Sequence, residues 1–318
     1  MNQQNKIHVG IHHGARELEN NILLQSIPGL KDLHTNIEQF RNVAFNYNNL
    51  NKGNSFIKNG REKFNNNISI LANRGMGKSS ALLTVIREIT NGRLFVKERY
   101  EKNTIDIINP MIDPEDIQSD ILGWVIASLS ERIEEIENLL KKSNHKMFIL
   151  EESPESMLSK LKEKRNRLIN CYSINREGYD HVALHRSINV NDYSKNLKEV
   201  LNYDYELHRA FEEFIDCLVE VKRKLNKTIN ELDTIDNEPL IYFFFDDLDM
   251  SSKKSIKILT DILSYFYHQN IVIFITGDYA VFEQSIKTFF LNETKDITLK
   301  MPEAEKKKEV MFADNRAE

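Results

Sequence analysis

Residues 68–80, Ile-Ser-Ile-Leu-Ala-Asn-Arg-Gly-Met-Gly-Lys-Ser-Ser, constrain the fold more than any other stretch of this 318-residue chain. An apolar run ends in a short turn with two glycines, and a lysine and two serines then open a segment with helical spacing. A strand, a tight turn and a helix in this order are typical of α/β proteins with a parallel sheet. Gly75 and Gly77 lack a Cβ atom, so the backbone of the turn is free to adopt left-handed conformations.

The same stretch predicts a phosphate-binding loop. Ala72 stands where the usual pattern of such loops has its first glycine, and a small residue suits that position. We expect the N–H groups of the loop and of the following helix start to surround a phosphate. Lys78 would neutralise phosphate charge, and the Ser79 hydroxyl would bind Mg²⁺. The alternative is a plain strand–turn–helix joint with a surface lysine.

The residues expected to contact a bound nucleotide come from this loop and from one later position. They are Asn73, Arg74, Gly75, Met76, Gly77, Lys78, Ser79, Ser80 and Asp278.

The composition excludes several classes of protein. The net charge of −5 and the isoelectric point of about 6.0 give no sign of a generally basic, nucleic-acid-binding chain. Cys171 and Cys217 are too few for a disulfide framework or a metal cluster. The first residues lack the apolar segment of a signal peptide, and no apolar run is long enough to span a bilayer. We therefore expect a cytoplasmic protein without a membrane span.

Two apolar runs predict the centre of a parallel sheet. Residues 240–245 and 271–276 are continuous β-formers, which is the pattern of strands covered on both faces. Helical patterns follow each run, over residues 251–267 and 279–290. Alternating strands and helices predict an α/β fold, in which ligands bind at the carboxyl ends of the strands.

A further strand is expected at residues 104–108, where Pro110 and Pro114 would close it. Asp113 is a good N-cap for a helix that we expect to begin at Glu115 and to continue to about residue 140. Two helices are expected within residues 17–48, before the nucleotide core.

The middle of the chain predicts a helical insertion. Residues 156–168 form a charged amphipathic helix, residues 172–192 read as a loop, and residues 193–232 predict one or two long helices. The basic residues of 156–168 could contact nucleic acid or an acidic partner, although a solvated helix face is the more common meaning of such a pattern.

Acidic residues follow the apolar run at 240–245. Asp246 is the candidate to hold Mg²⁺ through water, at the end of a strand next to the one that precedes the loop. Asp247 is the candidate general base, and Asp249 could support it. The alternative is an acidic turn that caps the next helix. Thr276 or Asp278 could contact the terminal phosphate or its water, and Asp278 could equally cap a helix.

The loop at 72–80, together with Phe-Phe-Phe-Asp-Asp-Leu-Asp at 243–249, resembles the AAA+/STAND branch of P-loop NTPases. In particular, it is similar to the KAP-type ATPases and to the related bacterial anti-phage ATPases. The segment 112–117 before a helix also looks like that group. The resemblance implies a Walker A lysine at Lys78, a magnesium serine at Ser79, and Walker B acids at Asp246 and Asp247.

From the resemblance we expect a Mg²⁺-dependent ATPase that assembles into a homo-oligomeric ring and serves anti-phage defence or signalling. An effector enzyme would be its partner, such as a nuclease or the adenosine deaminase with which one such system is coupled. Two other functions stay open: a nucleotide-gated scaffold with little turnover, and a nucleic-acid motor. No arginine finger can be assigned among Arg74, Arg132, Arg176, Arg186 and Arg209.

The expected organisation combines core and inserted segments: N-terminal helices at 1–60, the first part of the NTPase core at 61–134, the helical insertion at 135–237, the second part of the core at 238–300 and a charged tail at 301–318. Members of the family usually carry a helical lid after the core. We expect the chain to be a piece of a longer protein without that lid.

Overall fold

The computed structural model describes residues 32–50, 64, 66–91, 105–113, 120–143, 153–176, 190–230, 238–248 and 252–293. The strands are β1 (Asn67–Leu71), β2 (Ile107–Ile112), β3 (Ile241–Phe245) and β4 (Ile271–Gly277). The helices are α2 (Leu33–Leu50), α3 (Lys78–Thr90), α4 (Ile121–Ser143), α5 (Pro154–Arg176), α7 (Val190–Asn230), α8 (Ser252–Tyr265) and α9 (Tyr279–Glu293).

The strands form one parallel sheet in the order β1-β4-β3-β2. The predicted α/β fold with a parallel sheet is therefore confirmed. Every residue of β3 and of β4 is buried, as their continuous apolar sequences predict for central strands. One detail of the prediction is wrong: β3 is not the neighbour of β1, because β4 lies between them.

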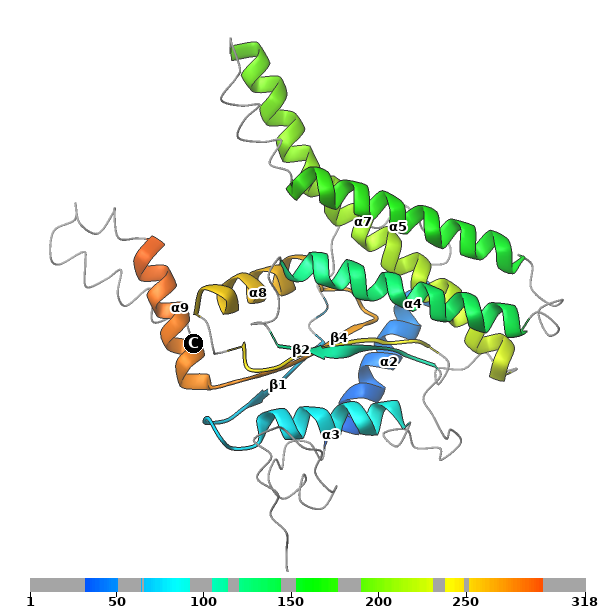
Figure 1. Cartoon of the computed structure of the whole chain (residues 1–318), viewed down its shortest axis with the longest axis horizontal. Helices are drawn as coiled ribbons and strands as arrows, with labels where there is room; N and C mark the ends of the chain where they lie inside the picture. The colour runs from blue at the N-terminus through cyan, green and yellow to red at the C-terminus, as the bar shows by residue number, and fades with distance from the viewer. Residues whose placement is uncertain are drawn as a thin grey trace, which may run out of the picture.

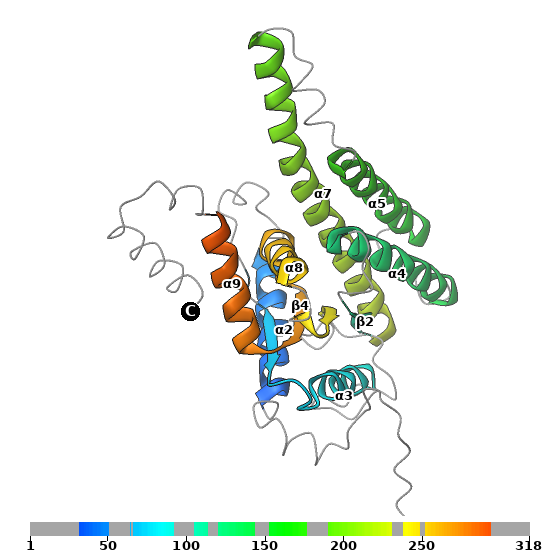
Figure 2. The same cartoon turned by 60° about the vertical axis from the view of Figure 1, so that its left-hand side comes forward.

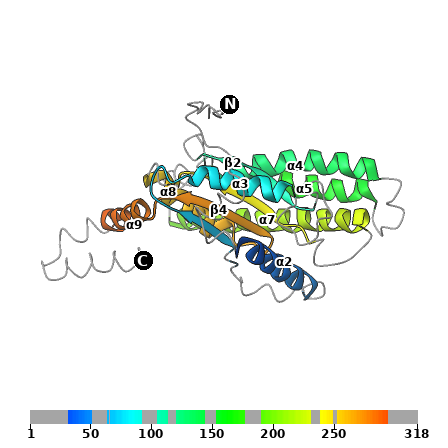
Figure 3. The same ribbon diagram turned by 90° about the horizontal axis from the view of Figure 1, so that it is seen from below.

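Helices cover both faces of the sheet, so the core has three layers (Figure 1). Side chains alternate along a strand: Phe243 and Phe245 join the apolar cluster of α4, α5, α7 and α8, whereas Tyr242 and Phe244 join the cluster of α2 and α3. Figure 3 views the sheet from the side that α3 and α2 cover. Aromatic rings are thus packed on both faces of β3, which fixes its register.

Strand β2 differs from the expected strand at 104–108, because it runs from Ile107 to Ile112 through Pro110. Proline cannot donate to a neighbouring strand, so it is tolerated at the edge of a sheet. β2 is such an edge and pairs with β3 alone among the described strands. Its pairing shifts register between Ile108 and Met111, and Pro110 is exposed.

Helix α4 begins at Ile121, and its N-cap is Asp120 rather than Asp113. The Asp120 Oδ1 atom accepts a hydrogen bond of 2.7 Å from the Gly123 N–H group, which is the usual N-cap arrangement. The expected helix start at Glu115 falls outside the described residues.

The described part of the segment predicted as an insertion consists of long helices that pack on one face of the sheet. α5 extends to Arg176, five residues into the stretch that was expected to be a loop, and α7 is a single helix of 41 residues. Apolar residues of α4, α5 and α7 share one cluster with the sheet. The amino-terminal part of α7 projects past the end of α5 (Figures 1 and 2).

Helix α2 is the second of the two helices expected before the core, and Ile37 and Ala44 on it are buried. The first of these helices lies outside the described residues. The tail at 301–318 does so as well.

Candidate functional site

The carboxyl ends of the strands bring the predicted site residues to one edge of the sheet. Leu71 at the end of β1 lies opposite Gly277 of β4, and Ile70 lies opposite Thr276. Phe245 at the end of β3 lies opposite Ile275. The turns that follow β1 and β4 therefore leave the same edge, at the left in Figure 1.

The turn after β1 has the backbone expected of an anion-binding loop. Gly75 and Gly77 have φ angles of +82° and +80°, a conformation in which an L side chain is strained. A Cβ atom at either glycine would meet nothing within 4 Å. The two positions therefore favour glycine because of their backbone conformation. There is enough space around them for a side chain.

Helix α3 starts directly after this turn with no side-chain cap. Its N-cap residue is Gly77, which has no side chain to accept hydrogen bonds from the N–H groups of the first turn. The first N–H groups of a helix have no partner within the helix, and the helix dipole makes that end positive. The start of α3 is therefore suited to an anion.

Lys78 is buried although it carries an ammonium group. The residue is 5% exposed, and Nζ donates to the carbonyl oxygens of Ala72 at 2.9 Å and of Asn73 at 3.5 Å. The ammonium thus lies against the backbone of the loop rather than on the surface. Lys78 is therefore not at the surface, as the alternative of a plain strand–turn–helix joint had it.

The other predicted loop residues line the same turn. Asn73, Arg74 and Met76 are exposed, whereas Ser79 and Ser80 on the first turn of α3 are half-buried. No ion pair of Arg74 is seen among the described residues, which leaves its predicted contact with a nucleotide or a neighbour open.

Asp246 follows β3 and is 7% exposed. Its N–H group donates to the Ile112 carbonyl oxygen of β2 at 2.8 Å, so it still belongs to the sheet. Its Oδ1 atom accepts a hydrogen bond of 2.5 Å from the Thr276 hydroxyl. The carboxylate is therefore oriented by β4, the strand that lies between β3 and the loop.

Asp247 has a left-handed backbone with a φ angle of +46°. Its N–H group donates to the Thr276 Oγ1 atom at 2.9 Å. Asp and Asn tolerate this conformation better than most residues, although it still costs free energy. The backbone thus leaves the direction of β3 at the residue proposed as a base. Asp249 lies outside the described residues.

Asp278 caps helix α9. Its Oδ1 atom accepts a hydrogen bond of 2.9 Å from the Ala280 N–H group. The predicted N-cap role is confirmed, and the predicted contact with a nucleotide stays a prediction. Gly277 before it was not singled out from the sequence; a Cβ atom there would lie 2.1 Å from the Phe282 ring, so a larger residue would require that ring to move.

One strand, β4, lies between β1, which leads into the loop, and β3, which leads into Asp246 and Asp247. Two strand spacings are about 10 Å, a gap that a phosphate group with a hydrated metal ion can span. The candidate donors are backbone N–H groups, an ammonium, a serine hydroxyl and carboxylates. This set fits a nucleoside triphosphate with Mg²⁺, which prefers oxygen ligands and keeps several waters.

The arginines considered as fingers lie elsewhere or are not described. Arg132 pairs with Glu135 on α4, and Arg209 pairs with Glu213 on α7. The side chains of Arg176 and Arg186 fall outside the described residues. The contacts of the two described side chains, Arg132 and Arg209, are thus with carboxylates of their own helices rather than with the edge described above.

The basic residues of α5 face carboxylates of neighbouring helices. Lys162 pairs with Glu137 of α4 at 2.8 Å, and Lys164 pairs with Glu213 of α7 at 2.8 Å. Arg167 pairs with Glu206 and Glu213 of α7 at 2.8 and 2.6 Å. The charges of these three residues are therefore largely compensated within the protein, which weakens the prediction of a nucleic-acid contact.

Comparison with known proteins places the chain in no family: no family model and no curated protein matches its sequence. Among the described residues, no helix is both long and apolar enough to cross a membrane.

Proposed function

We propose that the carboxyl edge of the sheet binds a nucleoside triphosphate with Mg²⁺ and hydrolyses it. One observation carries the proposal: a loop with two left-handed glycines leads into an uncapped helix start and a buried lysine. This arrangement brings an ammonium group and the positive end of a helix to one point, which is the requirement of phosphate binding.

Each residue of the site has a distinct role in this proposal. The Lys78 ammonium leaves the loop carbonyls and neutralises the outer phosphates, and the Ser79 hydroxyl binds the metal ion. Asp246 holds a water of the metal ion with the carboxylate oxygen that Thr276 does not occupy. Asp247 orients the attacking water and accepts its proton.

The identity of the nucleotide and the biological setting rest on the resemblance to KAP-type and STAND ATPases. It favours ATP, a homo-oligomeric ring, a cytoplasmic location and an effector enzyme as partner in anti-phage defence. Arg74 of the loop or an arginine of a neighbouring subunit would then supply the positive charge at the terminal phosphate.

The test is phosphate release from ATP by the purified protein, compared with Lys78→Ala and Asp247→Asn. Lys141→Ala is the matched control, because its ammonium is exposed at the end of α4 and pairs with Glu137 only one helical turn away. We expect both site variants to lose at least about a hundredfold in turnover and the control to lose none.

Light scattering of the same samples, with and without ATP, separates the two main functions. Turnover that both site changes abolish supports a hydrolase, and a rate that rises with protein concentration supports a site shared between subunits. ATP-dependent assembly that survives Asp247→Asn without turnover supports the nucleotide-gated scaffold instead. Absence of nucleotide binding in the wild-type protein overturns the proposal.

A further inference from the structure

We propose that Thr276 is a positioning residue that sets the geometry of both acids through one hydroxyl group. The inference rests on the proposed function of the same site. It differs from the predicted sensor role of Thr276, in which the hydroxyl contacts the terminal phosphate.

Thr276 is fully buried in β4, the strand between the loop and the acids. Its hydroxyl donates to Asp246 Oδ1 at 2.5 Å and accepts the Asp247 N–H group at 2.9 Å. A hydroxyl has one proton to donate. Because Asp246 receives that proton, the hydroxyl has none left for a phosphate oxygen in this arrangement.

The two hydrogen bonds fix different features of the acidic pair. The bond to Oδ1 restrains rotation of the Asp246 carboxylate and leaves Oδ2 to a water of the metal ion. The bond from the Asp247 N–H group holds a left-handed residue whose φ angle is +46°. Strained backbone of this kind persists only where the surroundings hold it. One hydroxyl therefore determines how both carboxylates are presented.

The arrangement also explains why the hydroxyl must come from β4. Thr276 lies opposite Ile70 of β1, so its Cα is held in register with the strand that carries the loop. The same residue contacts the two acids that follow β3. The residue that contacts both acids is thus held in register with the strand that leads into the phosphate loop.

If Thr276 had only a structural role, its substitution would lower the stability of the protein without changing Mg²⁺-dependent nucleotide binding. Thr84 is the matched control, because it is equally buried, lies on α3 and donates its hydroxyl to the Ser80 carbonyl oxygen at 2.7 Å. Valine has nearly the shape of threonine without the hydroxyl, and serine keeps the hydroxyl without the methyl group. The informative variants are therefore Thr276→Val, Thr276→Ser and Thr84→Val.

The first readout is the affinity for a fluorescent ATP derivative, measured in EDTA and again in Mg²⁺. For Thr276→Val we expect affinity within about twofold of wild type in EDTA and about tenfold weaker binding in Mg²⁺, the factor that corresponds to one lost hydrogen bond to a charged group. Thr276→Ser should restore most of the Mg²⁺-dependent affinity. Thr84→Val should not change the ratio of the two affinities.

The second readout is phosphate release as a function of Mg²⁺ concentration. For Thr276→Val we expect a lower kcat and a higher Mg²⁺ requirement, with the nucleotide KM nearly unchanged at saturating Mg²⁺. Loss of affinity in EDTA to the same extent as in Mg²⁺, or a serine variant as impaired as the valine variant, overturns the positioning role.

The two proposals fail in different ways. Wild-type protein that binds the ATP derivative without turnover contradicts hydrolysis, and the affinity ratio then still decides the role of Thr276. Wild-type protein that binds no nucleotide contradicts both proposals. Normal turnover and normal Mg²⁺ dependence in Thr276→Val contradict the positioning role alone.

Discussion

Lys222 is a charged residue in the interior of the protein. It lies on α7 at 4% exposure, and burial lowers the pKa of its ammonium from the usual 10.5 to about 8. Asp106 and Glu135 act in the opposite direction but do not offset the cost of burial. A cation held in this way weakens the folded state at neutral pH.

This residue predicts a rise of stability with pH. Below pH 8 both states carry the proton, and between pH 8 and 10.5 the unfolded state binds more protons than the folded state, so stability increases with pH. The gain from pH 7 to pH 9.5 is about 2 kcal/mol. We expect Lys222→Met to be more stable at pH 7 and to lose this rise, as measured by urea unfolding at both pH values.

The pH range of that measurement must stop below pH 10. Burial also raises the pKa of the Tyr242 hydroxyl well above its usual 10, so its titration in the unfolded state lowers stability at higher pH. If the free energy of unfolding of Lys222→Met rises between pH 7 and 9.5 as steeply as that of wild type, another group causes the rise.

At the scale of elements, apolar contact and ion pairs both join α5 to α7. Met157, Leu161 and Leu168 of α5 are buried in the cluster that α7 shares. Lys164 and Arg167 flank that contact and pair with Glu213. Partly exposed ion pairs contribute about 0–1 kcal/mol each, whereas a buried leucine contributes several. The apolar face should therefore dominate the pairing of the two helices.

Substitutions on the two sides of α5 test this comparison. We expect Leu161→Ala to lower the free energy of unfolding by about 2–5 kcal/mol and Lys164→Met to lower it by less than about 1 kcal/mol. Denaturation by urea measures both changes, and the small effect of Lys164→Met should shrink further in 1 M salt. If Lys164→Met lowered the free energy of unfolding as much as Leu161→Ala or more, ion pairs rather than apolar contacts would stabilise the packing of α5 on α7.

The elements that the sequence predicts well are those whose pattern is local. β3 and β4 are continuous apolar runs, and α3 begins at Lys78 because two glycines precede it. The edge position of β2 depends on the order of strands in the sheet, so nothing near Pro110 indicates that the strand continues through it. Asp113 and Asp120 are equally good N-caps by residue type, so the sequence pattern alone does not show that α4 begins after Asp120.

The candidate site likewise has a local part that the sequence predicts and a part that depends on contacts between distant residues. Loop residues from Asn73 to Ser80 form one contiguous segment, and their conformation follows from glycines within it. The hydrogen bonds that orient the acids join Thr276 to residues about thirty positions earlier in the chain. Such partners are set by the register of β3 against β4, which the sequence pattern alone does not specify.

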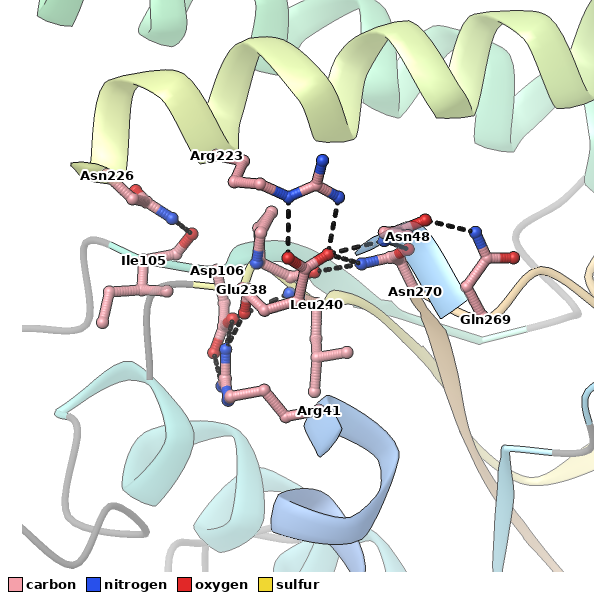
Figure 4. Close-up of polar contacts among 11 residues, drawn as sticks. Arg41, Asn48, Ile105, Asp106, Arg223, Asn226, Glu238, Leu240, Gln269 and Asn270 are labelled. Carbon is pink, nitrogen blue, oxygen red and sulfur yellow. Dashed lines mark hydrogen bonds and ion pairs between the residues drawn. The ribbon is translucent and has the colours of Figure 1, made fainter. Parts of the chain in front are cut away.

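At the scale of the whole molecule, a polar network lies at the edge of the sheet opposite the candidate site (Figure 4). It joins α2 and α7 to the starts of β2, β3 and β4. Arg41 of α2 makes a bidentate pair with Asp106, both bonds being 2.9 Å, and Asp106 also accepts the Leu240 N–H group. Although burial opposes its charge, Asp106 raises the pKa of Arg41 above its already high value.

Glu238 is the second anion of this network. Its carboxylate accepts two hydrogen bonds from Arg223 of α7, at 2.7 and 2.8 Å, and further bonds from Asn48 and Asn270. Its backbone carbonyl accepts a bond from Arg41. Two cations and two anions thus balance in the interior, and each carboxylate has several donors, which is the condition under which buried charges are tolerated.

The pair of Arg41 and Asp106 predicts strong non-additivity. Either Arg41→Met or Asp106→Asn removes the hydrogen-bonded opposite charge of its buried partner, and each should cost about 3–5 kcal/mol of unfolding free energy. The double variant has no unpaired charge, so its loss should fall short of the sum of the single losses by about 1–3 kcal/mol.

Urea unfolding of the four proteins completes this double-mutant cycle, with Arg209→Met as the control because that arginine is exposed and its pair lies one helical turn away. The control should cost less than about 1 kcal/mol. Additive losses in the cycle would mean that Arg41 stabilises the fold through the bond to the Glu238 carbonyl and its apolar contacts. Coupling within the predicted range would mean that the charge pair itself joins α2 to the sheet, so that the helix preceding the core is part of the folding unit that carries the candidate site.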